Sequence, residues 1–330
     1  GRPSLVLESG DVCAGPAQDL SNAEIVDLAV HDDMSIAVAR RLGGASNLWG
    51  GRCMPLDPCD FEPRPFARGA RWPIGLDDIA PYYEAACRYA TCGEPMFEAT
   101  IPGAHGADDD FSFESIERAS NTPKMHKAHA RELAASQRID LRLGATVVDF
   151  EIADNGAIEA AMIAGADGER RRIVADRFVI AAGGLESTRL LMIAQRRRPE
   201  MFGGADGPLG RYYMGHVIGE IADIFFRDDR FDDAFDLLRD GHGSYTRRRF
   251  TPSLALQQAQ GLPNICFWPI VPPIADPRHR SGALSAVALA LSTPVLKNIL
   301  LPEAIRIRHV GPHVDWLPHL RNVMSDAPRM

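Results

Sequence analysis

Several patterns that assign a protein to a class are missing from this chain of 330 residues. It has six cysteines but no Cys-x-x-Cys pair and no matched histidine spacing, so a structural zinc site is not expected. The longest apolar run, residues 283–296, is shorter than the ~20 residues that cross a bilayer and includes serines, a threonine and a proline. We therefore expect no membrane span, and a buried helix or strand at this run.

Positive charge is also scarce. Lysine and arginine number 36 against 44 acidic residues, and the net charge of -8 argues against a nucleic-acid or anionic-membrane partner. The arginine triplets at 170–172, 196–198 and 247–249 are scattered and have acidic neighbours, so we expect them on solvated faces. The cysteines are interpreted as reduced thiols of an intracellular protein, and we expect a cytoplasmic location.

One predicted helix, around KMHKAHARE, places His126, His129 and Glu132 on one face. This trio has two interpretations, a metal site or the ordinary polar surface of a helix. Surface helices commonly carry these residue types, so we favour the second interpretation and predict no metal site.

Hydrophobic periodicity predicts the middle of the chain as a series of strands. From residue 139 the pattern alternates with period two through IDLRLGATVVDFEI, and AIEAAMIAG follows after the turn residues Asp-Asn-Gly. The next stretch, ERRRIVADRFVIAAG, ends in the continuously apolar FVIAAGG at 178–184, which is typical of a strand buried on both faces. We therefore predict a β-meander that returns to a parallel sheet.

Helices and loops are expected around these strands. IGLDDIAPYYEAACRYATCG predicts a helix with Asp77 or Asp78 as N-cap, Pro81 in its first turn and Gly93 as its stop. The proline-rich stretch 53–73 cannot form a regular helix, because proline removes donors and fixes φ, and it is predicted to be a lid or connector.

The first apolar run, SLVLESG, is followed closely by an acid, Glu8. In a dinucleotide-binding unit such an acid binds the ribose and lies roughly 20 residues after a Gly-x-Gly-x-x-Gly loop. No such loop occurs in this chain, which starts with Gly1. We expect that the sequence begins after its first strand, phosphate loop and helix; the alternative is that Glu8 ends an ordinary edge strand.

Two glycine-rich segments suggest where a large flat ligand binds. RLGGASNLWGGR at 41–52 leaves the backbone almost bare around one amide and one indole. The second segment, 178–191, consists of an apolar run, Gly183-Gly184 and a predicted helix. The N-terminus of such a helix offers backbone donors to a phosphate. Asn47 could contact the ligand or cap its own turn, and Trp49 could pack near the ligand or anchor the loop.

These segments, in this order, resemble the glucose-methanol-choline (GMC) oxidoreductase family. GGASNLWGGRCMPLDPCDFE is similar to the family's loop beneath the flavin, and ARWPIGLDDIAPYYEAA to the helix that opens its substrate domain. FVIAAGGLESTRLLM resembles the strand and helix near the adenosine, and GPLGRYYMGH the end of the flavin domain. Details such as SNLWGG resemble bacterial members that act on sugars or sugar-like alcohols.

The resemblance implies a mixed α/β fold: a Rossmann-like FAD-binding domain with a β-meander, plus a second, substrate-binding domain, both incomplete. It assigns residues 1–56 and 135–216 to the FAD-binding domain, and 57–134 and 217–330 to the lid and substrate domain. The expected cofactor is FAD. The implied contacts to it are Glu8 at the ribose, Val148 at the adenine through its backbone, and, around the phosphates and ring, Arg41, Gly43, Gly44, Ser46, Asn47, Ala181, Ala182 and Gly183.

The activity that the resemblance implies is oxidation of an alcohol, in which a base takes the hydroxyl proton while hydride passes to flavin N5. The family's base is a C-terminal histidine, and no matching segment occurs before Met330, so the base is expected beyond that residue and this stretch alone is expected to be inactive. His216 is a weaker candidate for the base. The alternative is a non-catalytic flavin- or ligand-binding remnant.

Overall fold

The computed structural model describes the chain except residues 1, 28, 65, 67–71, 103–109, 166–167, 225–230, 232–233, 271–272, 294–313 and 327–330. Its contacts divide the chain into two compact units. The first comprises residues 1–100, 115–225 and 236–247, and the second comprises 101–114, 226–235 and 248–330. The family resemblance implies another division, into an FAD-binding domain and a substrate domain. That division is defined by function and stays a prediction.

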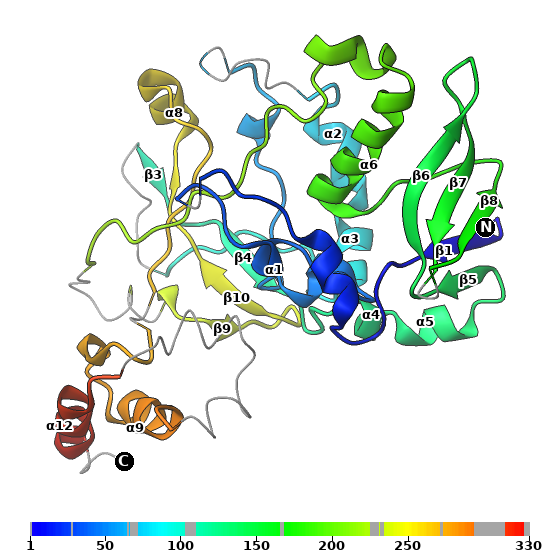
Figure 1. Ribbon diagram of the computed structural model, residues 1–330. Helices are drawn as coiled ribbons and strands as arrows, with labels where there is room; N and C mark the ends of the chain where they lie inside the picture. Colours follow the sequence, from blue (N-terminus) through cyan, green and yellow to red (C-terminus); the bar gives the residue numbers. More distant parts are fainter. Residues whose placement is uncertain are drawn as a thin grey trace. The chain divides into compact units, whose positions relative to one another are not determined.

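The first unit contains a parallel strand pair and an antiparallel meander (Figure 1). Strand β1 (Ser4–Leu7) pairs in parallel with β5 (Ile139–Arg142), which lies more than a hundred residues later in the chain. After Gly144, whose φ is +63°, the chain enters the antiparallel sheet β6-β7-β8. Its strands are β6 (Thr146–Ile152), β7 (Ile158–Ala164) and β8 (Arg170–Val174).

Helix α6 (Gly183–Arg197) packs on this sheet because both present apolar faces. Phe150 and Ala161 of the sheet meet Leu190 and Ala194 of the helix in one buried cluster. The predicted meander is confirmed, including the turn before Ala157, where Gly156 has φ +83°. The predicted long strand 139–152 is instead two strands that belong to different sheets.

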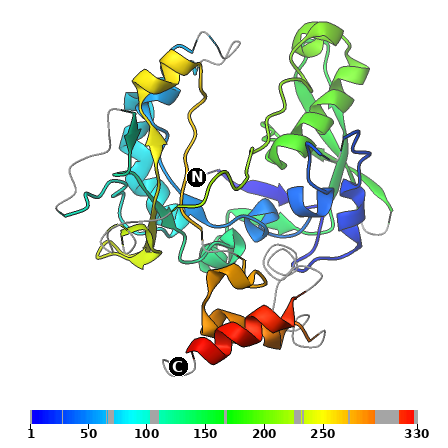
Figure 2. The same ribbon diagram turned by 90° about the vertical axis from the view of Figure 1, so that its left-hand side faces the viewer.

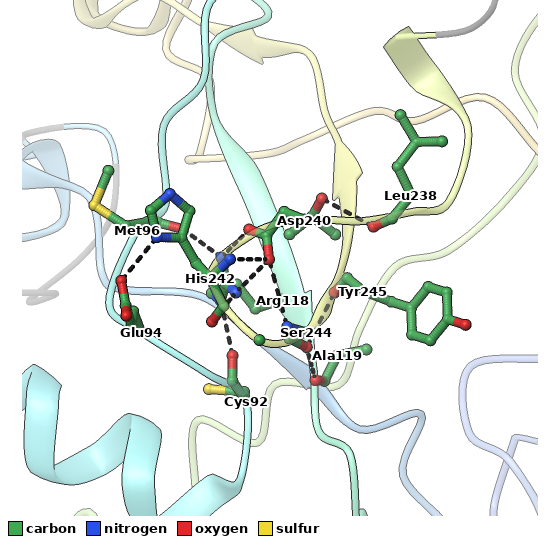
Figure 3. Close-up of polar contacts among 12 residues, drawn as sticks. Cys92, Glu94, Met96, Arg118, Ala119, Leu238, Asp240, His242, Ser244 and Tyr245 are labelled. Carbon is green, nitrogen blue, oxygen red and sulfur yellow. Dashed lines mark hydrogen bonds and ion pairs between the residues drawn. The ribbon is translucent and has the colours of Figure 1, made fainter.

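A four-stranded sheet of order β2-β4-β10-β9 forms the other part of this unit. Its strands are β2 (Arg52–Cys53), β4 (Ile116–Ala119), β9 (Leu238–Arg239) and β10 (Tyr245–Arg248). Figure 3 shows its polar centre, the fully buried Arg118. Its guanidinium donates to both carboxylate oxygens of Asp240, at 2.6 and 3.0 Å, and to the carbonyls of Cys92, Met96 and His242. All the donors of this arginine are therefore used to join three segments.

The remaining elements of the first unit are short. The helical ones are η1 (Pro16–Ser21), α1 (Met34–Ala37), η2 (Gly44–Asn47), η3 (Pro58–Asp60), α2 (Leu76–Ile79), η4 (Ala80–Tyr82), α3 (Tyr83–Ala90), α4 (Met125–Ala128), α5 (Ala130–Ala135) and η5 (Met201–Asp206).

The second unit is mainly helical. It contains a strand pair, β3 (Phe111–Ser112) with β11 (Thr251–Pro252), followed by α8 (Leu254–Gln260). The short helix η6 (Pro277–His279) precedes α9 (Gly282–Leu291), which lies beside α12 (Trp316–Asp326) (Figure 2). A separate aromatic cluster surrounds Phe113 and Phe235. Helix α9 confirms the predicted buried element as far as its described residues extend.

The structure corrects two further predictions of secondary structure and one of solvent exposure. Residues 177–182 form no strand, and Val179 is 89% exposed, because no strand in the described part of the chain pairs with this segment. The helix predicted at 74–93 is broken into three pieces around Pro81, and its N-cap is Gly75, to whose amide the Asp78 carboxylate bonds. The third arginine triplet is not solvated, since Arg248 and Arg249 are buried.

Both units mix helices and strands, as the α/β prediction requires. None of the described helices is both long enough and apolar enough to cross a membrane.

Candidate functional site

A buried arginine, Arg40, brings together three segments that the sequence analysis connected with a ligand. Its guanidinium donates to the Glu186 carboxylate at 2.5 Å, to the Ser21 hydroxyl at 2.6 Å and to the Ser9 hydroxyl at 3.0 Å. Ser9 follows β1, and Glu186 lies in the first turn of α6. The glycine loop begins three residues after Arg40, so its start is held beside the ends of β1 and α6.

Backbone contacts reinforce this arrangement. The Leu42 amide donates to the Asp11 carbonyl at 2.9 Å. A side chain at the buried Gly10 is excluded, because a Cβ there would lie 2.0 Å from the Arg40 carbonyl oxygen. The segment after β1 and the segment before the glycine loop therefore run in direct contact.

Glu8 lies where β1 ends, against the end of β5. Its amide donates to the Arg142 carbonyl and its carbonyl accepts from the Ala145 amide, both at 2.9 Å. One carboxylate oxygen accepts from the Gly10 amide at 2.8 Å. The side chain is partly exposed, and within the described chain its second carboxylate oxygen makes no hydrogen bond, so it is free to accept from a ligand.

The glycine loop depends on residues that tolerate positive φ. Gly43 and Gly44 have φ of +92° and +49°. A Cβ on Gly43 would lie 2.5 Å from Nδ1 of His126, whereas the same position on Gly44 meets nothing within 4 Å. One glycine is thus needed for packing, and the next leaves open space beside the backbone.

Three side chains fix this loop in place. The Asn47 amide donates to the carbonyls of Leu42 and Gly44, at 3.1 and 2.9 Å. Of the two roles considered for Asn47, contact with a ligand or capping of its own turn, these bonds correspond to the second. The Ser46 hydroxyl accepts from the Met125 amide at 3.1 Å. The Trp49 indole donates to the Pro123 carbonyl at 2.6 Å, which supports its role as an anchor.

Two buried nitrogens beside the loop lack partners. Nε of Arg41 and Nδ1 of His126 make no hydrogen bond within the described residues. Burial lowers the pKa of His126, and the charges of Lys127, Lys124 and Arg41 lower it further. Buried polar atoms are normally satisfied, so such atoms mark a place where a ligand or water is expected.

The N-terminus of α6 is open. Residues 181–184 are all exposed, and a Cβ on Gly183 or Gly184 would meet no atom within 4 Å. Gly183 has φ +80°, and the Ala182 amide donates to the Ser187 hydroxyl at 3.1 Å. The first two residues of this 15-residue helix therefore border free space, where the helix amides and dipole favour an anion.

Val148 lies at an irregularity in β6. The register between β6 and β7 shifts between Val147 and Asp149, so Val148 has no partner residue in the ladder. A bulge of this kind leaves a residue unpaired and bends the strand. This geometry is compatible with the predicted backbone contact to a ligand.

His216 and His129, which the sequence analysis considered, and the histidines near Met330 do not join this arrangement. His216 is exposed in an irregular segment. His129 stacks on Tyr89 and bonds to its carbonyl and to Glu132, and no group suited to a metal ion occurs among the described residues. His319 is fully buried between the Ser285 hydroxyl and the Ala275 carbonyl, and His309 and His313 lie outside the described residues.

Sequence reasoning missed Arg40 and Glu186, the pair that assembles the site. Each stood next to a predicted segment, but an isolated arginine or glutamate resembles a surface residue. Their positions in the sequence could have indicated their role. Arg40 directly precedes the glycine loop, and Glu186 lies in the first turn after Gly183-Gly184. Only the fold shows that these positions face each other.

No family model matches the chain. The chain is similar to the 2-methyl-1,2-propanediol dehydrogenase of Mycolicibacterium austroafricanum, with 29% identity over 274 residues. The match covers 67% of this chain and 50% of that dehydrogenase, so the chain spans about half the length of the curated relative it matches. The likeness is distant, and it connects the chain with a protein named as the dehydrogenase of a diol.

Proposed function

We propose that this chain is part of an FAD-dependent oxidoreductase of the GMC type that oxidises an alcohol group by hydride transfer to flavin N5. The observation that carries the proposal is the meeting of β1, the glycine loop and the start of α6 around Arg40. These are the segments whose sequences resemble the flavin-binding parts of that family. The similarity to a protein named as the dehydrogenase of a diol supports the same reaction class.

The residues present fit such a cofactor. Gly44, Gly183 and Gly184 border space that no protein atom fills, and Nε of Arg41 is a buried donor without a partner. The second oxygen of Glu8 is available to a pair of ribose hydroxyls. The donors and the acceptor therefore match an anionic pyrophosphate and a neutral diol, which are the two polar parts of the adenosine half of FAD.

We assign Glu8 to the ribose and the Val148 backbone to the adenine. The pyrophosphate and the ring would contact the remaining predicted residues, which are Arg41, Gly43, Gly44, Ser46, Asn47, Ala181, Ala182 and Gly183. When bound, the flavin supplies the hydride acceptor. The chain's own residues contribute binding and orientation: Arg40 holds the three segments in register, and the Asn47 and Trp49 bonds keep the loop rigid.

For the substrate we propose a small polyol or sugar-like alcohol. The bacterial sequences that SNLWGG resembles suggest sugars, and the matched relative is named for a small diol. Adjacent hydroxyl groups are common to both. We do not assign the base to His216, which is exposed in an irregular segment.

The test uses the longest natural form of the protein, with Glu8→Ala and the exposed Glu24→Ala as a matched control. Each charge-assisted hydrogen bond to the ribose is worth roughly 1.5–3 kcal/mol. Glu8→Ala should therefore raise the Kd for FAD by about tenfold or more, at about 1.4 kcal/mol per decade, whereas Glu24→Ala should not change it. Equal affinities in both variants would refute the ribose assignment.

The visible spectrum then separates binding from catalysis. A yellow protein whose flavin absorbance is bleached by a diol or sugar supports the oxidoreductase. A yellow protein that no alcohol bleaches would indicate the flavin-binding remnant instead, and a protein that takes up no FAD would contradict both.

A further inference from the structure

One short segment, which leads into α4, lies along the glycine loop. The Met125 amide donates to the Ser46 hydroxyl at 3.1 Å, and the Trp49 indole donates to the Pro123 carbonyl at 2.6 Å. At the end of the loop, a Cβ on Gly51 would lie 3.0 Å from the Cβ of Pro123. The segment therefore touches the loop at several points, although the family resemblance assigns the two to different domains.

His126, in the first turn of α4, extends this contact to the start of the loop. If Gly43 carried a Cβ, that atom would lie 2.5 Å from Nδ1 of the His126 ring and 3.2 Å from its Cγ. A real Cβ essentially never approaches another atom this closely, so the ring occupies the space that a side chain at Gly43 would need. The imidazole is thus packed on the bare backbone of Gly43.

The two glycines at the start of the loop have different neighbours. Gly43 is backed by His126, whereas a Cβ on Gly44 would meet no atom within 4 Å. The Asn47 amide nitrogen also borders Gly43, 3.1 Å from the place of the absent Cβ, and it donates to the Gly44 carbonyl at 2.9 Å. The ring therefore supports the loop backbone at one residue, and open space adjoins the backbone at the next.

This support matters because glycine backbone is easily disordered. Gly43 and Gly44 have φ of +92° and +49°, and glycine loses more conformational freedom on folding than any other residue. A binding site performs well when packing by surrounding residues holds it within about 0.5 Å of its productive geometry. His126 supplies such packing from outside the loop.

We propose that His126 is a positioning residue of the cofactor site: its ring holds the backbone of Gly43 and Gly44 in the orientation that bound FAD requires. Because Nδ1 is buried, this edge of the ring acts on the cofactor through Gly43 and not by direct contact. The inference rests on the proposed function, since it takes the glycine loop as part of the FAD site.

The test is a titration of the longest natural form with FAD. His126→Ala removes both ring atoms that lie against Gly43 and should raise the Kd by about tenfold, because binding must then order the loop. His126→Asn keeps an atom at each of these two places and should bind FAD nearly as tightly as the wild type. His129→Ala is the matched control, since His129 stacks on Tyr89, and it should leave the Kd unchanged.

A second readout separates positioning from a contribution to stability alone. The visible circular dichroism of the bound flavin reports the protein groups around its ring. It should change in His126→Ala and return to the wild-type spectrum in His126→Asn. Far-UV circular dichroism and urea unfolding identify the temperature at which every variant is folded, and the FAD titrations are made there.

Gly43→Ala provides an independent comparison, because its Cβ would collide with the ring and displace the loop. This variant should bind FAD more weakly than the wild type, and adding His126→Ala should recover part of the lost affinity. Two substitutions that affected only the fold would show no such recovery in the Kd for FAD.

The outcomes distinguish this inference from the proposed function. A wild-type protein that takes up no FAD would overturn both. If the wild type binds FAD and folded His126→Ala binds it equally well, with the same flavin spectrum, the positioning role is wrong and the FAD site stands. A His126→Asn variant as defective as His126→Ala would also overturn the role, because packing on Gly43 would not explain the loss.

Discussion

Arg40 and Arg118 are two buried arginines in the same unit, and their partners differ in kind. Arg118 uses one carboxylate and three backbone carbonyls. Arg40 is bonded mainly to side chains, those of Glu186, Ser9 and Ser21, and Glu186 is shared with Arg189 at 2.9 Å. Both join segments more than a hundred residues apart, but only one does so at the predicted cofactor site.

This difference in partners indicates a structural role for Arg118 and a role in forming the candidate site for Arg40. Loss of Arg118 would remove the guanidinium donor from three backbone carbonyls, those of Cys92, Met96 and His242, and would leave the half-buried Asp240 carboxylate with only the His242 and Ser244 amides as donors within the described residues. Around Arg40, two of the partners are hydroxyls that can rotate, and Glu186 keeps a second cation. We therefore expect Arg118 to dominate stability and Arg40 to dominate the geometry of the site.

The largest effect is expected for Arg118→Met. Removing one partner of a buried ion pair typically costs about 3–5 kcal/mol, and Arg118, which is fully buried, also donates to three backbone carbonyls. The free energy of unfolding from urea titration should fall by that amount. Arg88→Met, which breaks an exposed pair with Glu84, is the control and should cost no more than about 1 kcal/mol. Similar losses in the two variants would show that Arg118 is not a centre of stability.

Arg40→Met should cost less, about 2–3 kcal/mol, because Arg189 still faces Glu186. Its effect on FAD binding should exceed that of Arg118→Met at temperatures where both variants are folded. Isothermal titration with FAD in the longest natural form measures this. If Arg118→Met weakened FAD binding more than Arg40→Met, the division of roles would be reversed.

The glycine loop next to Arg40 offers a finer comparison. Gly43→Ala and Gly44→Ala both place a side chain at positive φ, but only the first meets the His126 ring. Gly43→Ala should therefore destabilise the protein by about 1–3 kcal/mol more than Gly44→Ala. Thermal or urea unfolding measures the difference. Adding His126→Ala should remove it, and a difference that survives would place the strain elsewhere.

The smallest effect is expected for the loss of stability at low pH, to which Asp240 contributes. Although burial raises it, the pKa of Asp240 is lowered overall by hydrogen bonds from Arg118 and from the Ser244 and His242 amides. A carboxyl whose folded pKa lies below its unfolded value, near 3.9, adds stability above that pH. This stability is lost as the pH falls through the folded pKa. Urea midpoints between pH 6 and 2 should thus decline less steeply in Asp240→Asn, and parallel curves would contradict the assignment.

The sequence predicted local features best. Alternation of apolar and polar residues and the Asp-Asn-Gly turn were sufficient to predict the meander, because its strands are neighbours in the sequence. The prediction of a strand at 178–184 was wrong, since an apolar run does not reveal whether a partner strand pairs with it. The buried Arg248 and the Arg40–Glu186 pair were missed for a related reason: burial of a charge depends on partners far away in the chain.

For the candidate site, motif order indicated which segments matter but not what connects them. Glu8, the glycine loop and Gly183 were all singled out, and their shared contacts with Arg40 or its neighbours came only from the fold. Their roles in binding FAD stay predictions.

The pairing of Ser4 in β1 with Ile139 in β5 has a consequence for how the chain folds. Closing so long a loop is entropically costly, and structures dominated by such distant contacts fold slowly. During synthesis, β1 cannot pair until β5 has been made, and Arg40 cannot form its ion pair until Glu186 has been made. The meander and α6 are the elements whose contacts are local, so they are expected to form first and to provide the surface on which the N-terminal segment settles.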